Sequence, residues 1–115
     1  MSTARRTRSS AKPRTHAQIF AALGEEHRLA IVMRLHDGQP RSISQLTAGS
    51  RLTRQAVTKH LHVLQKAGIV CSARAGRESL FRLDARPLEE ARSYLKAIAD
   101  QWDAALERLR LLVEG

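Results

Sequence analysis

Residues 53–70, TRQAVTKHLHVLQKAGIV, are the stretch that decides the fold of this 115-residue chain. At 3.6 residues per turn, the apolar side chains of this stretch form one stripe, which consists of Ala56, Val57, Leu61, Leu64 and Ala67. Thr53 is a suitable N-cap, and Gly68 can end the helix before the β-branched pair Ile69 and Val70. The stretch therefore predicts a short amphipathic helix that is followed at once by a strand.

The other side of this predicted helix is polar and basic. It carries Arg54, Gln55, Thr58, Lys59, His62, Gln65 and Lys66. Side chains of these types can hydrogen-bond to base edges and phosphates in the major groove of DNA. An ordinary amphipathic surface helix with a solvated face fits the same pattern, so the neighbouring segments have to distinguish the two.

The preceding segment predicts a second, shorter helix. Ser42-Ile43-Ser44-Gln45 matches a capping box, and residues 47–52 form a brief connection without periodicity. A short capped helix, a turn and a longer amphipathic helix form a helix-turn-helix pattern, in which the second helix enters the major groove. Any three-helix core is the alternative interpretation.

The following segment predicts a β-hairpin. Residues 69–74 and 79–84 have strand composition, and Ala-Gly-Arg-Glu at 75–78 joins them, with Arg74 and Arg77 near the tip. A basic hairpin directly after a recognition helix is a wing, whose tip can reach the neighbouring minor groove or backbone. The fold expected is mainly α with a β-hairpin wing, a winged helix-turn-helix.

Two helices are expected before this unit. The first covers residues 15–23, and the second covers residues 25–36 with Leu29, Ile31, Val32 and Leu35 on its buried face. With the hairpin and the final helix they complete a domain over residues 15–113. Residues 1–14 carry five Lys/Arg, no acid and few hydrophobics, which predicts a disordered basic tail.

The last helix, over about residues 87–113 and opened by Pro87, carries a heptad seam. The seam repeats at alternating spacings of three and four and consists of Leu88, Ala91, Leu95, Ile98, Trp102, Ala105, Leu109 and Leu112. So small a domain cannot cover so long a stripe, which predicts a homodimer through the terminal helices, with Ile19 and Phe20 assisting. Packing of the seam across its own domain is the alternative.

Composition narrows the function. The formal net charge is +9, and the excess of Lys/Arg lies in residues 1–83, as expected of a polyanion binder. There is neither an apolar run of membrane-spanning length nor a signal peptide, so we expect a cytoplasmic protein with no membrane partner. A paired nucleophile and base, a metal-ligand motif and a Gly-rich phosphate loop are also missing, which argues against an enzyme.

The amino-acid sequence of several segments resembles that of the ArsR/SmtB (arsenic-repressor) family of bacterial regulators. The matching segments are Glu26-His27-Arg28-Leu29-Ala30-Ile31, residues 52–61, Leu64, Ala67-Gly68-Ile69-Val70, Gly76-Arg77-Glu78 and Phe81-Arg82-Leu83. The resemblance implies DNA-facing roles for Thr53, Arg54, Gln55, Thr58, Lys59 and His60, with Ser42 and Gln45 near the backbone and Arg74 and Arg77 in the wing. Arg54 and Gln55 suit base contacts, whereas Lys59, His60 and Ser42 suit phosphates.

The chain departs from the metal sensors of that family. The short helix that begins at Ser42 has no thiol, and the last helix offers Asp100, Asp103 and Glu107 but no His. The single cysteine, Cys71, cannot form an intrachain bridge, and His60 and His62 point to different faces of one helix. We therefore expect the branch without a metal site or cofactor.

Together these features predict a dimeric repressor that binds a pseudo-palindromic double-stranded DNA operator. A winged-helix protein-interaction module and a non-specific nucleic-acid binder are the alternatives.

Overall fold

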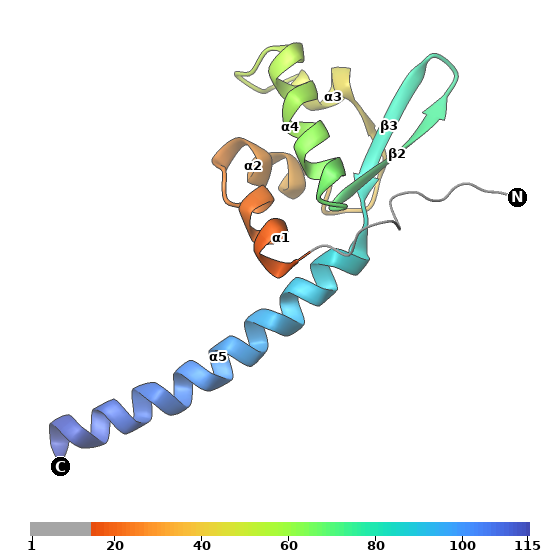
Figure 1. Ribbon diagram of the computed structural model, residues 1–115. Coiled ribbons are helices and arrows are strands. Elements are labelled where there is room, and N and C mark those ends of the chain that lie inside the picture. Colours follow the sequence, from red (N-terminus) through yellow and green to blue (C-terminus); the bar gives the residue numbers. More distant parts are fainter. Residues whose placement is uncertain (1–14) are drawn as a thin grey trace, which may run out of the picture.

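The protein, seen in a computed structural model that describes residues 15–115, is a small helical body with a hairpin at one end and a long helix at the other (Figure 1). Its elements in chain order are α1 (His16–Leu23), α2 (Glu26–Arg34), β1 (Arg41–Ser42), α3 (Ile43–Thr47), α4 (Arg54–Lys66), β2 (Val70–Ala75), β3 (Glu78–Leu83) and α5 (Ala85–Glu114). The order and type of the predicted helices and of the hairpin are confirmed. The predicted tail, residues 1–14, lies outside the described residues.

The helical body packs around the apolar stripe of α4. Leu61 and Leu64 are fully buried there, together with Ile19 of α1 and Leu35 at the end of α2. One expectation for α2 was wrong, because Leu29 is 46% exposed. Ile31, Val32 and Leu35 already supply the side of this short helix that faces the core.

Side chains at the helix starts fix where each helix begins. Thr15 accepts the N–H of Gln18, and the side chain of Gln18 accepts the N–H of Thr15. Ser42 and Gln45 form the same reciprocal capping box at α3. These bonds satisfy backbone donors that have no partner within the helix.

The hairpin is part of a three-stranded antiparallel sheet in the order β1-β3-β2. The sequence did not predict β1, in which Arg41 pairs with Phe81 and Ser42 with Leu80. A strand of two residues is too short to show alternation, and its pairing depends on residues far along the chain. Gly76, in the turn between β2 and β3, has a φ of 65°, a conformation that favours glycine.

Helix α5 begins earlier than predicted. Asp84 is its N-cap and accepts the N–H of Arg86 at 3.1 Å, so Pro87 is the third residue of the helix rather than the first. Proline is tolerated there because first-turn N–H groups have no helical acceptor. No helix within residues 15–115 is both long and apolar enough to cross a membrane.

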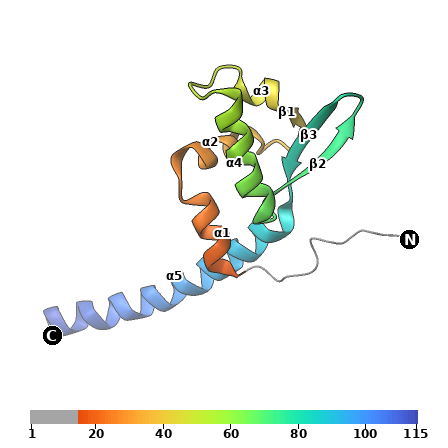
Figure 2. The same cartoon turned by 45° about the horizontal axis from the view of Figure 1, so that its top comes forward.

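The long axis of α5 leads away from the helical body. In both views its C-terminal end lies far from the other elements, while the start of α4 and the tip of the hairpin lie at the opposite end of the molecule (Figures 1 and 2). This arrangement separates the two predicted functional surfaces.

Candidate nucleic-acid interface

The first turns of α4 present the predicted polar face to solvent. Burial of Val57, Leu61 and Leu64 orients the helix so that its other side is outward. Thr53, Arg54, Gln55, Lys59 and His62 are exposed on that side, and Thr58 is half-buried. The hydroxyl of Thr58 donates to the carbonyl of Arg54 at 2.8 Å and keeps its lone pairs available.

Arg54 is held by the preceding helix. Its Nη1 donates to Oγ of Ser44 in α3 at 2.5 Å. Helix α3 is held in turn by Arg34 of α2, whose guanidinium donates to the carbonyls of Gln45, Leu46 and Ala48 at 3.0, 2.8 and 3.2 Å. These contacts hold α3 and α4, the two helices of the motif, in a fixed orientation relative to each other.

The hairpin places two arginines beside this face. Arg74 and Arg77 are exposed at its tip, which projects on the same side of the molecule as the start of α4 (Figure 2). The base of the hairpin is tied to α4, since Nε2 of Gln65 donates to Oγ of Ser72 at 3.0 Å. The arrangement can offer cationic donors to two neighbouring parts of one polyanion.

Ser42 is not on this surface, contrary to the prediction. It is 4% exposed, it pairs with Leu80 in the sheet, and its hydroxyl caps α3. Gln45 is exposed, although its Oε1 is used by the capping box. The same capping signal that located α3 therefore removes Ser42 from the candidate surface.

His60 is the second correction. Its side chain is 20% exposed and faces α2, where its Nδ1 lies 3.8 Å from Oε1 of Glu25. The helical geometry explains this placement, because His60 follows Val57 by three positions and precedes Leu64 by four, which puts it at the edge of the buried stripe.

A cluster of Glu25, His27 and His60 was missed by the sequence reasoning. Oε2 of Glu25 lies 2.7 Å from Nδ1 of His27, and the rings of His27 and His60 are 5.6 Å apart and nearly parallel. The N–H of Arg28 donates to Glu25, and together with His27 it lowers the pKa of Glu25 to about 2 although desolvation acts in the opposite direction. The Glu-x-His spacing was visible in the sequence, but nothing there brought α4 next to it.

The heptad seam of α5 is divided between two environments. Ala91 is 4% exposed and Leu88 packs against the core, so these residues contact their own domain, as Ile19 does. The prediction that Ile19 and Ala91 contact a second subunit was wrong, because α1 packs against the first turns of α5.

From Leu95 onward the seam is exposed to solvent. Leu95, Trp102 and Leu109 are 52, 64 and 56% exposed. Ala105 is exposed and Ile98 half-buried.

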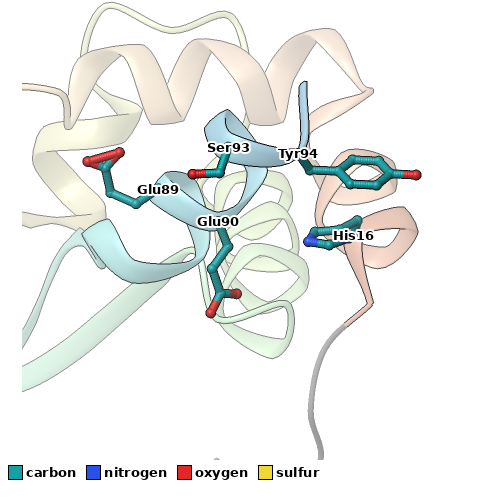
Figure 3. Close-up of a pocket in the computed structure, with 5 residues that line it drawn as sticks. All are labelled: His16, Glu89, Glu90, Ser93 and Tyr94. Atoms are coloured by element: carbon teal, nitrogen blue, oxygen red, sulfur yellow. The ribbon is translucent and has the colours of Figure 1, made fainter. Parts of the chain in front are cut away.

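Aromatic rings join α1 to α5 where the exposed part of the seam begins. The imidazole of His16 stacks on Tyr94 with ring centroids 4.1 Å apart (Figure 3). The ring of Phe20 packs on the same tyrosine with centroids 6.1 Å apart. Glu89, Glu90 and Ser93 line the hollow beside this stack. The half-buried Phe20 thus lies beside the start of the exposed seam, and its part in a dimer stays a prediction.

Several known proteins are similar to this chain over most of its length. The family profile described as a helix-turn-helix domain matches residues 23–71. The HTH-type transcriptional regulator Rv2034 of Mycobacterium tuberculosis is 33% identical over 102 residues, which are 89% of this chain and 92% of that protein. The solved ArsR-like transcriptional regulator from Rhodococcus sp. RHA1 is 35% identical, with a TM-score of 0.70 over 84% of this chain and 91% of its own.

The chain belongs to the ArsR/SmtB family. Its fold is the winged helix-turn-helix of these transcriptional regulators, as predicted. The repressor SmtB of Mycobacterium tuberculosis is 36% identical over 66 residues, and the chain spans only about half of its length (48%).

The fold extends to a fragment of Mb0332 from Mycobacterium bovis, solved as a homodimeric winged helix-turn-helix DNA-binding domain. The likeness has a TM-score of 0.59 at 21% identity.

Acidic residues of α5 in this ArsR/SmtB-type regulator are engaged with neighbouring cations. Asp100 lies 3.3 Å from Nζ of Lys96, and Glu107 lies 2.7 Å from the guanidinium of Arg110, which lowers the pKa of Glu107. These i,i+3 and i,i+4 pairs match the interpretation of these acids as a solvated polar face.

Proposed function

We propose that this ArsR/SmtB-type regulator represses transcription in the bacterial cytoplasm as a homodimer bound to a pseudo-palindromic operator. The single observation that carries the proposal is the placement of two unlike surfaces at opposite ends of the molecule. An exposed polar face of α4 with a basic wing lies at one end, and the bare apolar seam of α5 lies at the other. Residues 15–113 act as one domain in this proposal.

The α4 end supplies the DNA contacts. Arg54 and Gln55 stand at the start of the helix, where side chains of a recognition helix meet base edges, and both can form bidentate hydrogen bonds. Contacts to phosphates are assigned to Thr53, Thr58, Lys59, His62 and Gln45, and contacts to the neighbouring minor groove or backbone to Arg74 and Arg77.

The α5 end forms the dimer interface in this proposal. Pairing the exposed part of the seam, from Leu95 to Leu112, with the same surface of a second copy removes its large apolar side chains from water. The two recognition helices of the pair then reach half-sites about one helical turn of DNA apart. The Mb0332 fragment, which has the same fold, is itself described as homodimeric, and this supports the proposal.

Operator selection tests the proposal. Purified full-length protein is incubated with randomised DNA at two salt concentrations, and the retained sequences are read. We expect a two-fold symmetric motif whose binding weakens steeply with salt, because many phosphates are neutralised. Retention without sequence preference would favour a non-specific nucleic-acid binder, and no retention would favour a protein-interaction module.

A further inference from the structure

We propose that Glu25, His27 and His60 form a binding site for a divalent transition-metal ion of the Zn²⁺ type. The site joins the start of α2 to the middle of α4. It lies outside the proposed DNA surface and does not depend on it. The site uses neither α3, which contains no cysteine in this chain, nor the acidic residues Asp100, Asp103 and Glu107 of α5.

The three side chains converge from two elements that are far apart in sequence. Their ligand atoms all lie within 4.8 Å of one another. Glu25 Oε2 is 2.7 Å from His27 Nδ1, and Glu25 Oε1 is 3.8 Å from His60 Nδ1. Two ligands of one ion at bond lengths near 2.1 Å stand about 3.4 Å apart in a tetrahedron, so small side-chain rotations suffice.

The ligand chemistry selects a borderline transition metal. Two imidazoles and one carboxylate are the protein ligands of open, four-coordinate zinc sites, whereas Ca²⁺ and Mg²⁺ prefer sets made of oxygen alone. Imidazole nitrogen suits Zn²⁺ and similar transition metals, and the carboxylate of Glu25 completes the ligand set.

The surroundings hold the ligands and leave the ion accessible. Glu25 is fixed as the N-cap of α2 by the N–H of Arg28 at 2.8 Å, and His60 is fixed between the buried residues Val57 and Leu61 of α4. The side chains of His27, Glu25 and His60 are 43, 32 and 20% exposed. A water molecule can thus complete the coordination from the solvent side.

The test is a zinc titration of untagged, chelator-treated full-length protein, followed by calorimetry and by thermal unfolding. We expect one Zn²⁺ per chain and a rise in Tm of at least about 4 °C, because an ion that binds only the folded state stabilises it. Residues 1–14 contain no His, Cys, Asp or Glu, so the tail offers no competing side-chain ligands.

Variants then identify the ligands. His27→Ala removes a well-exposed ligand, and Glu25→Gln keeps an oxygen that can cap α2 while losing the charge. Each should weaken zinc binding at least tenfold and abolish the rise in Tm. His62→Ala and His36→Ala, at exposed histidines on the same two-helix unit, are the matched controls and should bind like the wild type.

Two outcomes for the wild type and the cluster variants would overturn the site. One is a wild-type protein that binds no stoichiometric zinc, and the other is equal zinc affinity in His27→Ala, Glu25→Gln and the wild type. In either case the cluster is a helix cap with two flanking imidazoles. A Cys71→Ser variant that loses binding would likewise contradict the ligand assignment, because Cys71 does not belong to the cluster.

Discussion

Arg54 is oriented before it meets any partner. Its hydrogen bond with Ser44 links the first residue of the recognition helix to α3, so part of the conformational entropy of a long side chain is already lost in the free protein. Gln55, next to it, is exposed on the same side. Base recognition at this site would therefore combine a restrained arginine with its neighbouring amide.

Gln55 and Lys59 should give different signatures on DNA. Gln55→Ala is expected to cost about 1–3 kcal/mol on the selected operator and to relax its sequence preference, because a base contact is lost. Lys59→Ala is expected to weaken operator and random DNA alike and to reduce the salt slope by about one. Titrations on both DNAs at several salt concentrations measure this. Equal losses on the two DNAs for Gln55→Ala would remove it from the base-reading set.

Ser44 should contribute only through Arg54. Ser44→Ala is expected to lower operator affinity by about 0.5–1.5 kcal/mol, the range for one hydrogen bond, while leaving the helices folded. In a double-mutant cycle it should add little to Arg54→Ala, since the interaction is already gone. Fully additive losses would mean that Ser44 contacts DNA by itself.

At the scale of elements, the relation between α2, α3 and α4 depends on Arg34. Its guanidinium accounts for three carbonyl groups at the end of α3, a helix of only five residues that has few other ways to satisfy them. A planar group with donors on both arms can serve three acceptors at once, and an ammonium group on a flexible stem cannot do so in the same geometry.

Arg34→Lys should therefore destabilise the domain although the charge is kept. We expect a loss of about 1–2 kcal/mol in the free energy of unfolding, seen as a lower urea midpoint with an unchanged slope. Arg92→Lys, at an exposed pair with Glu89 on α5, is the control and should stay within about 0.5 kcal/mol of the wild type. A loss for Arg34→Lys no larger than for the control would contradict the proposed role.

The elements also show where prediction from sequence succeeds. The α4 stripe, its cap at Thr53 and the glycine turn of the hairpin are local signals, and the structure has each of them. Several of the failures are long-range. β1 needs β3 as a partner, His60 is turned toward α2 by packing, and Ser42 and Ile19 lose their predicted roles because the core closes over them. The Glu25–His27–His60 cluster escaped for the same reason.

At the scale of the whole molecule, the apolar seam of α5 is the main surface that a single chain leaves exposed to water. A single chain leaves Leu95, Trp102, Leu109 and Leu112 more than half exposed, and Trp102 is the only tryptophan of the protein. Such a surface favours self-association. In the proposed dimer the affinity for an operator depends on both copies binding together, so residues far from DNA influence it.

Leu109→Glu should separate the subunits and weaken operator binding. A buried, unpaired carboxylate opposes pairing of the seam, so we expect a monomer in sedimentation equilibrium and a loss of operator affinity of at least tenfold. Leu111→Glu is a close control, because Leu111 is 55% exposed, like Leu109 at 56%, but lies off the seam. It should remain dimeric. Two variants that behave alike would show that the a/d pattern does not define the interface.

The junction between β3 and α5 has a mechanical consequence. Only Asp84 stands between the last wing residue and the first residue of α5, and its N–H donates to the carbonyl of Ile69 at 2.8 Å, at the base of β2. Because this connection is one residue long and is held by a hydrogen bond to Ile69, the wing has little freedom to rotate relative to α5. The crossing angle of two α5 helices would then set the distance between the wing tips, and a substitution at the helix crossing would change which operator spacing the protein accepts.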